Sequence, residues 1–184
     1  KWFRPVDLEL APDGTLYIAD FYNRIIGHYE VPLTHPGRDR ERGRIWRVVY
    51  TGENSRPPRP MPDLSKASDE VLAGLLKDPT LTVRVRAVNR LAERRATAVV
   101  QVAMDAEPAA PFLQAYGLWV LERGGVLLQP RVTSLLKHDD RLVRVQALKA
   151  LAERRTWTFE APLVRERLRD AEAYVRRAAA EDLG

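Results

Sequence analysis

The sequence has no cysteine and only three histidines among its 184 residues. Without thiols, this segment can form no disulfide, thiolate metal site, cysteine nucleophile or covalent haem attachment. Because histidines are also few, we expect no transition-metal site built from protein ligands alone. No apolar run approaches the length that crosses a bilayer, so we expect no membrane span in this segment.

The familiar catalytic motifs and any concentration of charge are also missing. The chain contains no Gly-x-Ser-x-Gly, P-loop, Rossmann glycine fingerprint or His-Glu-x-x-His sequence. The net charge of +5 is spread out, with ten basic and eight acidic residues before position 61 and twenty and seventeen after it. A nucleic-acid-binding protein usually gathers its positive charge into a stripe, so we expect no nucleic-acid partner.

An internal repeat fills the C-terminal two-thirds of the chain. Residues 75–95 return as residues 135–155 with twelve of twenty-one positions identical, and residues 167–184 form a weaker copy. Self-similarity at a fixed period predicts a stack of repeated units, a solenoid, instead of a single closed core. Such stacks usually bind or brace other molecules and rarely carry chemistry.

The spacing of apolar residues predicts two helices in each unit. In the first unit, Ser68 can cap a short helix that ends at Asp78-Pro79. The second helix then presents an apolar face to the core, made of Val83, Val85, Ala87, Val88, Leu91 and Ala92. Residues 143–152 repeat this face.

Two further pairs of helices complete the array. A degenerate middle unit spans residues 97–124, and a last pair spans residues 160–183 with a break near Asp170. Large aromatic residues at helical spacing are expected to fill the core, namely Tyr116, Trp119 and Trp157, together with Phe112 of the middle unit. The sequence therefore predicts four helical hairpins.

The N-terminal region has the alternating pattern of β-strands. Strands are predicted at residues 6–10, 16–19, 24–26 and 45–50, with a hairpin turn at Pro12-Asp13-Gly14. The resulting antiparallel sheet is too small to bury both faces alone, so it needs neighbours.

Residues 51–63 hold four prolines and few apolar groups, which is typical of a semi-rigid linker. We therefore expect a sheet region at residues 1–52, a linker at 53–65 and a helical domain at 66–184. Because the chain begins at Lys1 and its sheet is small, we also expect it to be a fragment of a longer protein.

The helical units carry a recognisable pattern: an Asp, a Val-Arg pair a few residues later, then Ala and Leu at helical spacing. It appears at Asp78/Val83-Arg84/Ala87/Leu91, Asp140/Val143-Arg144/Ala147/Leu151 and Asp170/Val175-Arg176/Ala179/Leu183. This pattern resembles HEAT repeats. The resemblance implies a mainly α fold, a HEAT-type α-solenoid, in which the Asp and Arg side chains pair between neighbouring units.

The first fifty residues resemble a different family. Pro-x-Asp-Leu, Pro-Asp-Gly-x-Leu-Tyr-Ile-Ala-Asp, Asn-Arg-Ile and Gly-Arg-Ile-Trp-Arg together look like the last β-propeller blade of sorbosone- and glucose-dehydrogenase-like proteins. In the membrane-bound-dehydrogenase-like proteins of planctomycete-type bacteria, such a propeller is followed by HEAT repeats. The order of sheet, proline-rich linker and helical units matches that layout.

This second resemblance implies a function for a longer parent protein. It implies a periplasmic or cell-surface location and oxidation of sugars or alcohols, with quinone, calcium or haem c as cofactors of the parent and none in this segment. The HEAT array would bind a protein partner or brace the parent's propeller. The alternative is a non-catalytic HEAT interaction module, and whether the protein is an enzyme stays open.

Candidate site residues follow the second strand, where propeller loops converge on a central channel. Asp20 and His28 are the candidate catalytic residues, and Asn23 and Arg24 are the candidate cofactor-binding residues. Carboxylate and amide oxygens suit calcium, and histidine suits general-base work, although no metal is assigned to this segment. Alternatively, Asp20 and Asn23 satisfy backbone groups of a turn, and Arg24 pairs with Asp20.

Two other features have competing interpretations. The arginines of residues 34–44 could recognise an anion, but interleaved Asp39 and Glu41 favour a solvated or docking loop. His138 occupies the position of Asp78 in the repeat and is expected to cap a helix end rather than bind a ligand.

Overall fold

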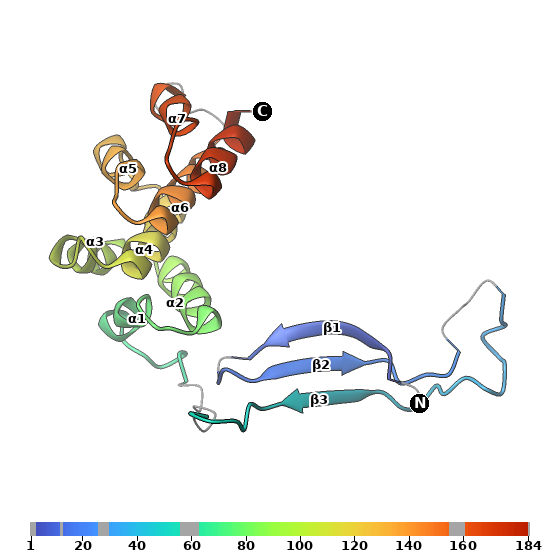
Figure 1. Cartoon of the computed structure of the whole chain (residues 1–184). Helices are drawn as coiled ribbons and strands as arrows, with labels where there is room; N and C mark the ends of the chain where they lie inside the picture. Colours follow the sequence, from blue (N-terminus) through green and yellow to red (C-terminus); the bar gives the residue numbers. More distant parts are fainter. Residues whose placement is uncertain (1–2, 12, 26–29, 56–62, 155–160, 184) are drawn as a thin grey trace. The chain divides into compact units, whose positions relative to one another are not determined.

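The computed structural model describes residues 3–11, 13–25, 30–55, 63–154 and 161–183. Contacts divide the chain into two units, Lys1–Met61 and Pro62–Gly184, and each is considered by itself (Figure 1). The described residues contain eight helices and one three-stranded antiparallel sheet. The prediction of a mainly helical chain with a small sheet is therefore confirmed. No helix in these ranges is long and apolar enough to cross a membrane.

The first unit contains the sheet, whose strands follow one another in the order β1-β2-β3. The strands are β1 (Pro5–Leu10), β2 (Leu16–Asp20) and β3 (Arg44–Val48). The predicted hairpin forms between β1 and β2, where Gly14 has a φ of +83° and its amide donates to the Ala11 carbonyl at 2.9 Å. Glycine suits this position because it adopts positive φ without steric cost.

The third predicted strand, at residues 24–26, is wrong for the two residues that the structure describes. Arg24 and Ile25 are not in a strand, and Ile26 lies outside the described residues. The Asn23 side chain accepts a hydrogen bond from the Ile25 amide at 3.2 Å, which closes a local turn instead of an extended segment.

The sheet presents one strongly apolar face. Pairing places Leu8 opposite Ile18 and Ile18 opposite Trp46, and directly paired side chains share a face. Leu10, Leu16 and Val48 extend this face by one further row. Leu8 is 60% exposed and Trp46 is 42% exposed. The described residues of this unit therefore leave the face uncovered.

The second unit is a double layer of helices (Figure 1). Each odd-numbered helix contacts the even-numbered helix that follows it, and successive even-numbered helices also contact one another. The helices are α1 (Asp69–Leu75), α2 (Leu81–Glu93), α3 (Thr97–Ala106), α4 (Pro111–Arg123), α5 (Gln129–Leu136), α6 (Arg141–Ala152), α7 (Ala161–Arg167) and α8 (Ala173–Leu183). Ser68 caps α1 as predicted, by accepting a hydrogen bond from the Val71 amide at 3.3 Å.

The core repeats with the sequence. The third residue of each even-numbered helix is buried, and so is the seventh. These residues are Val83, Leu113, Val143 and Val175, and Ala87, Gly117, Ala147 and Ala179. Gly117 allows α3 and α4 to approach closely, because a Cβ there would lie 2.7 Å from the Met104 sulfur.

Some predicted core positions are wrong. Val85 is 42% exposed, and Ala152 is also exposed. The aromatic residues of α4 do not fill the core either: Phe112 is exposed, and Tyr116 and Trp119 are only half-buried. The core of this helix is made by its aliphatic side chains instead, and Trp157 lies outside the described residues.

Candidate functional site

Asp20, at the end of β2, is a buried anchor of the sheet. Its Oδ1 accepts hydrogen bonds from the amides of Arg4 and Tyr22 at 2.8 and 2.9 Å, and its Oδ2 accepts one from the Trp46 indole at 2.8 Å. Burial acts to raise the pKa of Asp20, but these hydrogen bonds, led by that from Trp46, lower it below the usual value. A carboxylate of low pKa with three protein donors is a poor acceptor of a substrate proton.

The cation near Asp20 comes from β3 and not from the residue predicted to pair with it. Arg24 is exposed and forms no ion pair with Asp20. The Arg44 guanidinium instead lies 3.5 Å from the centre of the Tyr22 ring and 5.6 Å from that of Trp46. Arg44 also contributes to lowering the pKa of Asp20. The predicted pairing of Arg24 with Asp20 is therefore wrong.

Asn23 fastens the long loop between β2 and β3. Its Nδ2 donates to the Asp39 carbonyl at 2.8 Å, and its Oδ1 accepts from the amides of Ile25 and Asp39 at 3.2 and 3.4 Å. The side chain is buried, and its amide is occupied by backbone groups. His28 lies outside the described residues, so the catalytic assignment of Asp20 and His28 stays a prediction.

The loop arginines bind the loop itself. Arg38 donates to the carbonyls of Val31 and Pro32 at 2.7 and 3.1 Å, and Arg40 donates to the carbonyl of Leu33. An open groove of 580 Å³ runs along this loop, with Asp39 and Glu41 in its wall beside the arginines. Because carboxylates line the same groove, its charge is mixed and does not select an anion.

In the helical unit, one polar side chain recurs at the fourth residue of every even-numbered helix. Its guanidinium or amide donates to carbonyls in the last turn of the preceding helix or in the loop that follows that helix. Arg84 reaches Asp78 at 2.5 Å, Arg144 reaches His138 and Asp139 at 2.7 Å each, and Arg176 reaches Asp170 and Ala171 at 2.8 Å each. In α4 the residue is Gln114, whose Nε2 donates to Met104 and Glu107 at 2.8 and 3.1 Å.

These bonds satisfy carbonyls that a helix end leaves without partners. The sequence predicted the role of the arginines only as pairing with aspartate, and it missed Gln114 altogether. The signal was present, since Gln114 lies thirty residues after Arg84 and thirty before Arg144.

The predicted Asp–Arg pairing between neighbouring helix pairs occurs once, between α6 and the turn that precedes α8. Arg144 Nη2 lies 2.9 Å from Asp170 Oδ1, and the two side chains are 11% and 5% exposed. Arg167 lies 3.5 Å from the other Asp170 oxygen. Burial acts to raise the pKa of Asp170, but hydrogen bonds from the Glu172 amide and Arg144 outweigh it and lower the pKa.

Arg84 has no such carboxylate partner among the residues that the structure describes. Asp170 lies three residues before α8, and the residue three before α4 is Pro108. Proline has no side-chain hydrogen-bond acceptor, so this position offers Arg84 no ion pair. Arg84 packs instead against aromatic rings, 4.1 Å from the centre of Phe112 and 4.7 Å from that of Tyr116. The aromatic residues of α4 therefore occupy the interface where α6 and α8 have an ion pair.

His138 lies in the turn before α6, but the cap of that helix is Asp140 and not His138 as predicted. Its Nδ1 accepts a hydrogen bond from the amide of Asp140 at 2.9 Å, and Asp140 in turn caps α6 by accepting from the Leu142 amide at 2.7 Å. Its Nε2 lies 3.0 Å from the Pro108 carbonyl. The histidine thus stabilises the turn before α6 and contacts the preceding unit.

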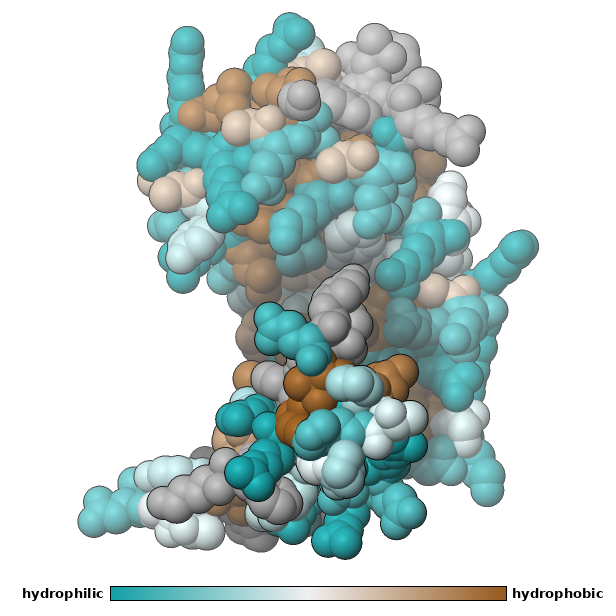
Figure 2. Space-filling view, turned by 90° about the vertical axis from the view of Figure 1, so that its right-hand side faces the viewer, coloured by the Kyte–Doolittle hydropathy of each residue, from teal (hydrophilic) through white to brown (hydrophobic). Residues whose placement is uncertain are grey.

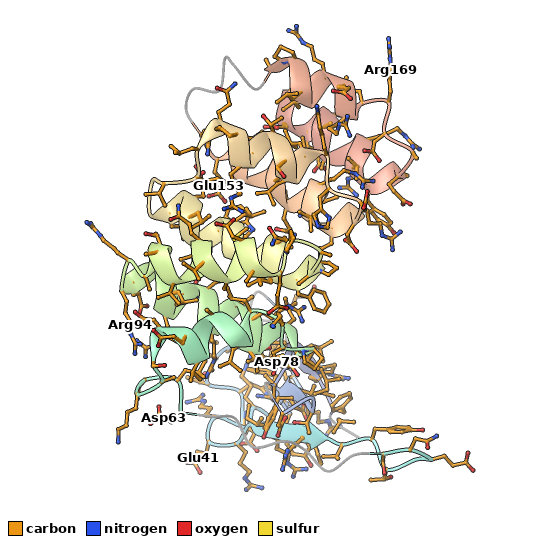
Figure 3. All side chains as sticks on the ribbon, turned by 90° about the vertical axis from the view of Figure 1, so that its left-hand side faces the viewer. Glu41, Asp63, Asp78, Arg94, Glu153 and Arg169 are labelled. Atoms are coloured by element: carbon orange, nitrogen blue, oxygen red, sulfur yellow. The ribbon has the colours of Figure 1, made fainter. Side chains whose placement is uncertain are left out.

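The opposite edge of the helical unit is held by other charged residues. Figure 3 shows Asp78 and Arg169 at one edge of the stack, and Arg94 and Glu153 at the other. Arg94 donates to Asp69 and to the Ala67 carbonyl at 2.9 and 2.7 Å. Among the described residues, no group of three or more His, Cys, Asp or Glu side chains is placed to hold a metal ion.

Comparison with known proteins assigns a family to the first unit only. Residues 1–52 match a family described as a domain of unknown function (DUF7133). The match covers 52 of 184 residues, less than half of the chain, so it does not place the whole chain in that family. Neither a curated protein nor a solved structure matches the chain.

Proposed function

We propose that the helical unit is a HEAT-type α-solenoid that serves as a protein-binding or bracing scaffold. The observation that carries this proposal is the polar side chain that recurs at the fourth residue of α2, α4, α6 and α8. Each pair of helices thereby closes its own turn in the same way, and it contacts the next pair through its even-numbered helix. Units that contact only their neighbours form extended surfaces suited to binding.

The first unit is proposed to be a blade of a β-propeller. Its exposed apolar face supports this, because a blade buries that face against its neighbours. The dehydrogenase-like activity of a longer parent, its quinone, calcium or haem cofactors and its periplasmic or cell-surface location stay predictions from resemblance. The bonding of Asp20 and Asn23 favours the alternative that this segment is a non-catalytic module.

The choice between enzyme and scaffold can be tested directly. The full chain would be assayed for reduction of a redox dye with sugars and alcohols, with and without quinone and calcium. We expect no turnover above that of buffer, for the natural chain and for Asp20→Asn alike. Turnover of the natural chain would overturn the non-catalytic interpretation. Its loss in Asp20→Asn would assign it to this site only if amide exchange of the strands were unchanged in that variant.

The stack itself can be tested by hydrogen exchange. Leu151 is fully buried in α6, and truncation to alanine at such a site costs about 2–5 kcal/mol through the cavity that it leaves. In a repeat stack, Leu151→Ala should speed amide exchange most in α6 and its contact helices α4, α5 and α8, and least in α1. An equal increase throughout α1–α8 would contradict a stack of semi-independent units.

A further inference from the structure

We propose that the outer surface of α2, α4 and α6, centred on Phe112, Tyr116 and Trp119, binds an acidic segment of a partner protein. We call this surface the aromatic face. The proposal rests on the scaffold function above and adds the surface and the chemistry of its partner. Figure 2 views the helical unit from the side of its even-numbered helices and shows apolar groups among hydrophilic ones.

The aromatic residues are not needed for the core of α4. Leu113, Leu118 and Leu121 are buried there and fill the interior, whereas Phe112 is 37% exposed. Phe112 and Tyr116 meet edge to face, with ring centres 6.5 Å apart. Three large rings therefore remain at the surface of one helix, which is unusual for residues without a partner and typical of binding hot spots.

The same positions are occupied differently in the neighbouring units. Tyr116 and Trp119 correspond to Arg86 and Asn89 of α2, and to Gln146 and Lys149 of α6. The repeat therefore does not require aromatic residues at these positions. Hydrogen bonds between helices fix the face: Trp119 Nε1 donates to Gln146 at 2.9 Å, and Arg123 donates to Asn89 at 2.8 Å.

Three cations on α2, α4 and α6 lack carboxylate partners among the described residues. Within the described part of the chain, Arg84, Arg123 and Lys149 form no ion pair. Arg84 is 6% exposed, and its Nε has no hydrogen-bond partner. The nearby carboxylates of Glu93 and Glu122 are paired with Arg90 and Arg154. Glu153, one turn beyond Lys149, differs from these two glutamates because it forms no ion pair among the described residues.

An acidic partner matches this charge. Positive potential beside exposed rings attracts carboxylates, while the rings give apolar contact to the partner's aliphatic or aromatic side chains. The cations are few and separated by rings and amides instead of forming a stripe, which favours a protein segment over the phosphate backbone of a nucleic acid.

The experiment is a selection from a random library of 12-residue displayed peptides on the immobilised full chain. We expect the enriched peptides to carry net negative charge. An enriched peptide should then bind about tenfold or more weakly to Trp119→Ala and to the charge-reversed pair Arg123→Glu and Lys149→Glu. Its affinity should also fall as salt is added, because exposed charges are screened.

Matched variants of the odd-numbered layer serve as controls. Val102→Ala in α3 removes an exposed apolar side chain, and Arg131→Gln in α5 removes a half-buried cation that is paired with the exposed Asp105. Both should bind the peptide as the natural chain does. Because Lys149 is exposed and makes no ion pair, Lys149→Glu alone keeps the test valid if another variant unfolds.

Each other outcome has a distinct meaning. Neutral or basic enriched peptides would overturn the proposal, as would acidic peptides that bind equally well to Trp119→Ala and Lys149→Glu. If the proposal fails in this way, the scaffold function can still hold. It would hold if the enriched peptides slowed hydrogen exchange in helices outside the aromatic face, because the peptides would then bind elsewhere on the helical unit. A single-stranded oligonucleotide that competes for the face more strongly than any peptide would also overturn the proposal. Dye turnover would concern the first unit alone, where it would overturn the non-catalytic interpretation, and it would leave the test of the aromatic face unchanged.

Discussion

We expect Arg144→Gln to weaken the contact between α6 and α8 while leaving the turn before α6 bonded. Arg144 donates to the carbonyls of His138 and Asp139 at 2.7 Å each, and it pairs with Asp170 at 2.9 Å. Gln114 shows that glutamine at this position of an even-numbered helix binds turn carbonyls. The glutamine variant should therefore lose the ion pair and keep the hydrogen bonds to the turn.

The size of the loss follows from the surroundings of Asp170. Breaking a buried ion pair costs about 3–5 kcal/mol, because one charge is left desolvated. Asp170 keeps Arg167 at 3.5 Å and the Glu172 amide at 3.0 Å, so we expect a smaller cost, about 2 kcal/mol. Arg144→Ala should cost about 2 kcal/mol more, since two further hydrogen bonds of about 1 kcal/mol each are lost.

The assay is urea unfolding of the natural chain, Arg144→Gln, Arg144→Ala, Asp170→Asn and the double variant of Arg144→Gln with Asp170→Asn. The double-mutant cycle should give a coupling of about 1–2 kcal/mol between the two side chains. Equal costs for the glutamine and alanine variants would show that the glutamine does not replace the turn bonds. A coupling of zero would refute the role given to the ion pair.

The same pair gives a pH dependence whose sign follows from the lowered pKa of Asp170. The unfolded chain binds a proton at a higher pH than the folded chain does. The stability that the ionised carboxylate contributes is therefore complete above the usual aspartate pKa of about 3.9, and it is lost as the pH falls through the folded pKa. Arg144→Gln should reduce this acid loss, which unfolding measured at about pH 7 and pH 3 would reveal.

Three further variants test other parts of the structure. Burial raises the pKa of Asp182 to about 6 from its ordinary 3.8, so stability should fall as the pH rises between these values. Asp182→Asn should remove that fall and add about 1 kcal/mol above pH 6, after allowance for partial exposure; unchanged unfolding midpoints would contradict this. Gly117→Ala should cost about 1–3 kcal/mol by displacing Met104, measured by the same unfolding, and a neutral effect would mean that the Met104 side chain moves aside without cost. Asp20→Asn should weaken the β1–β2–β3 sheet, seen as faster amide exchange at its strands, because an amide replaces a carboxylate that accepts three hydrogen bonds. An unaltered exchange pattern would remove its anchoring role.

The sequence was sufficient for the parts of the fold that depend on local spacing. Ser68, Asp78-Pro79 and Gly14 set a helix start, a helix end and a hairpin turn through their own backbone preferences. The repeated helices could be predicted because the same apolar spacing returns along the chain. The existence and order of these elements required no knowledge of their packing.

The roles of individual side chains depended on neighbours far away in the sequence. Val85 and the rings of α4 have the apolar character of core residues, yet the helices turn them outward because their backbone positions face away from the adjoining units. Asp20 is an aspartate at a strand end, a residue type and position that suit catalysis. In the structure, Trp46 donates a hydrogen bond to it and Arg44 lowers its pKa, and both residues belong to a strand more than twenty residues later.

The sequence by itself thus determined the repeat, its turns and the chemical types available on each helix. Only the tertiary structure decided which arginine meets a carboxylate and which meets aromatic rings. Arg84 and Arg144 have nearly the same local sequence, so their difference comes from the next pair of helices, where Arg84 meets Phe112 and Tyr116 and Arg144 meets Asp170. Electrostatic partners across an interface are set by distance in space, which local periodicity does not encode.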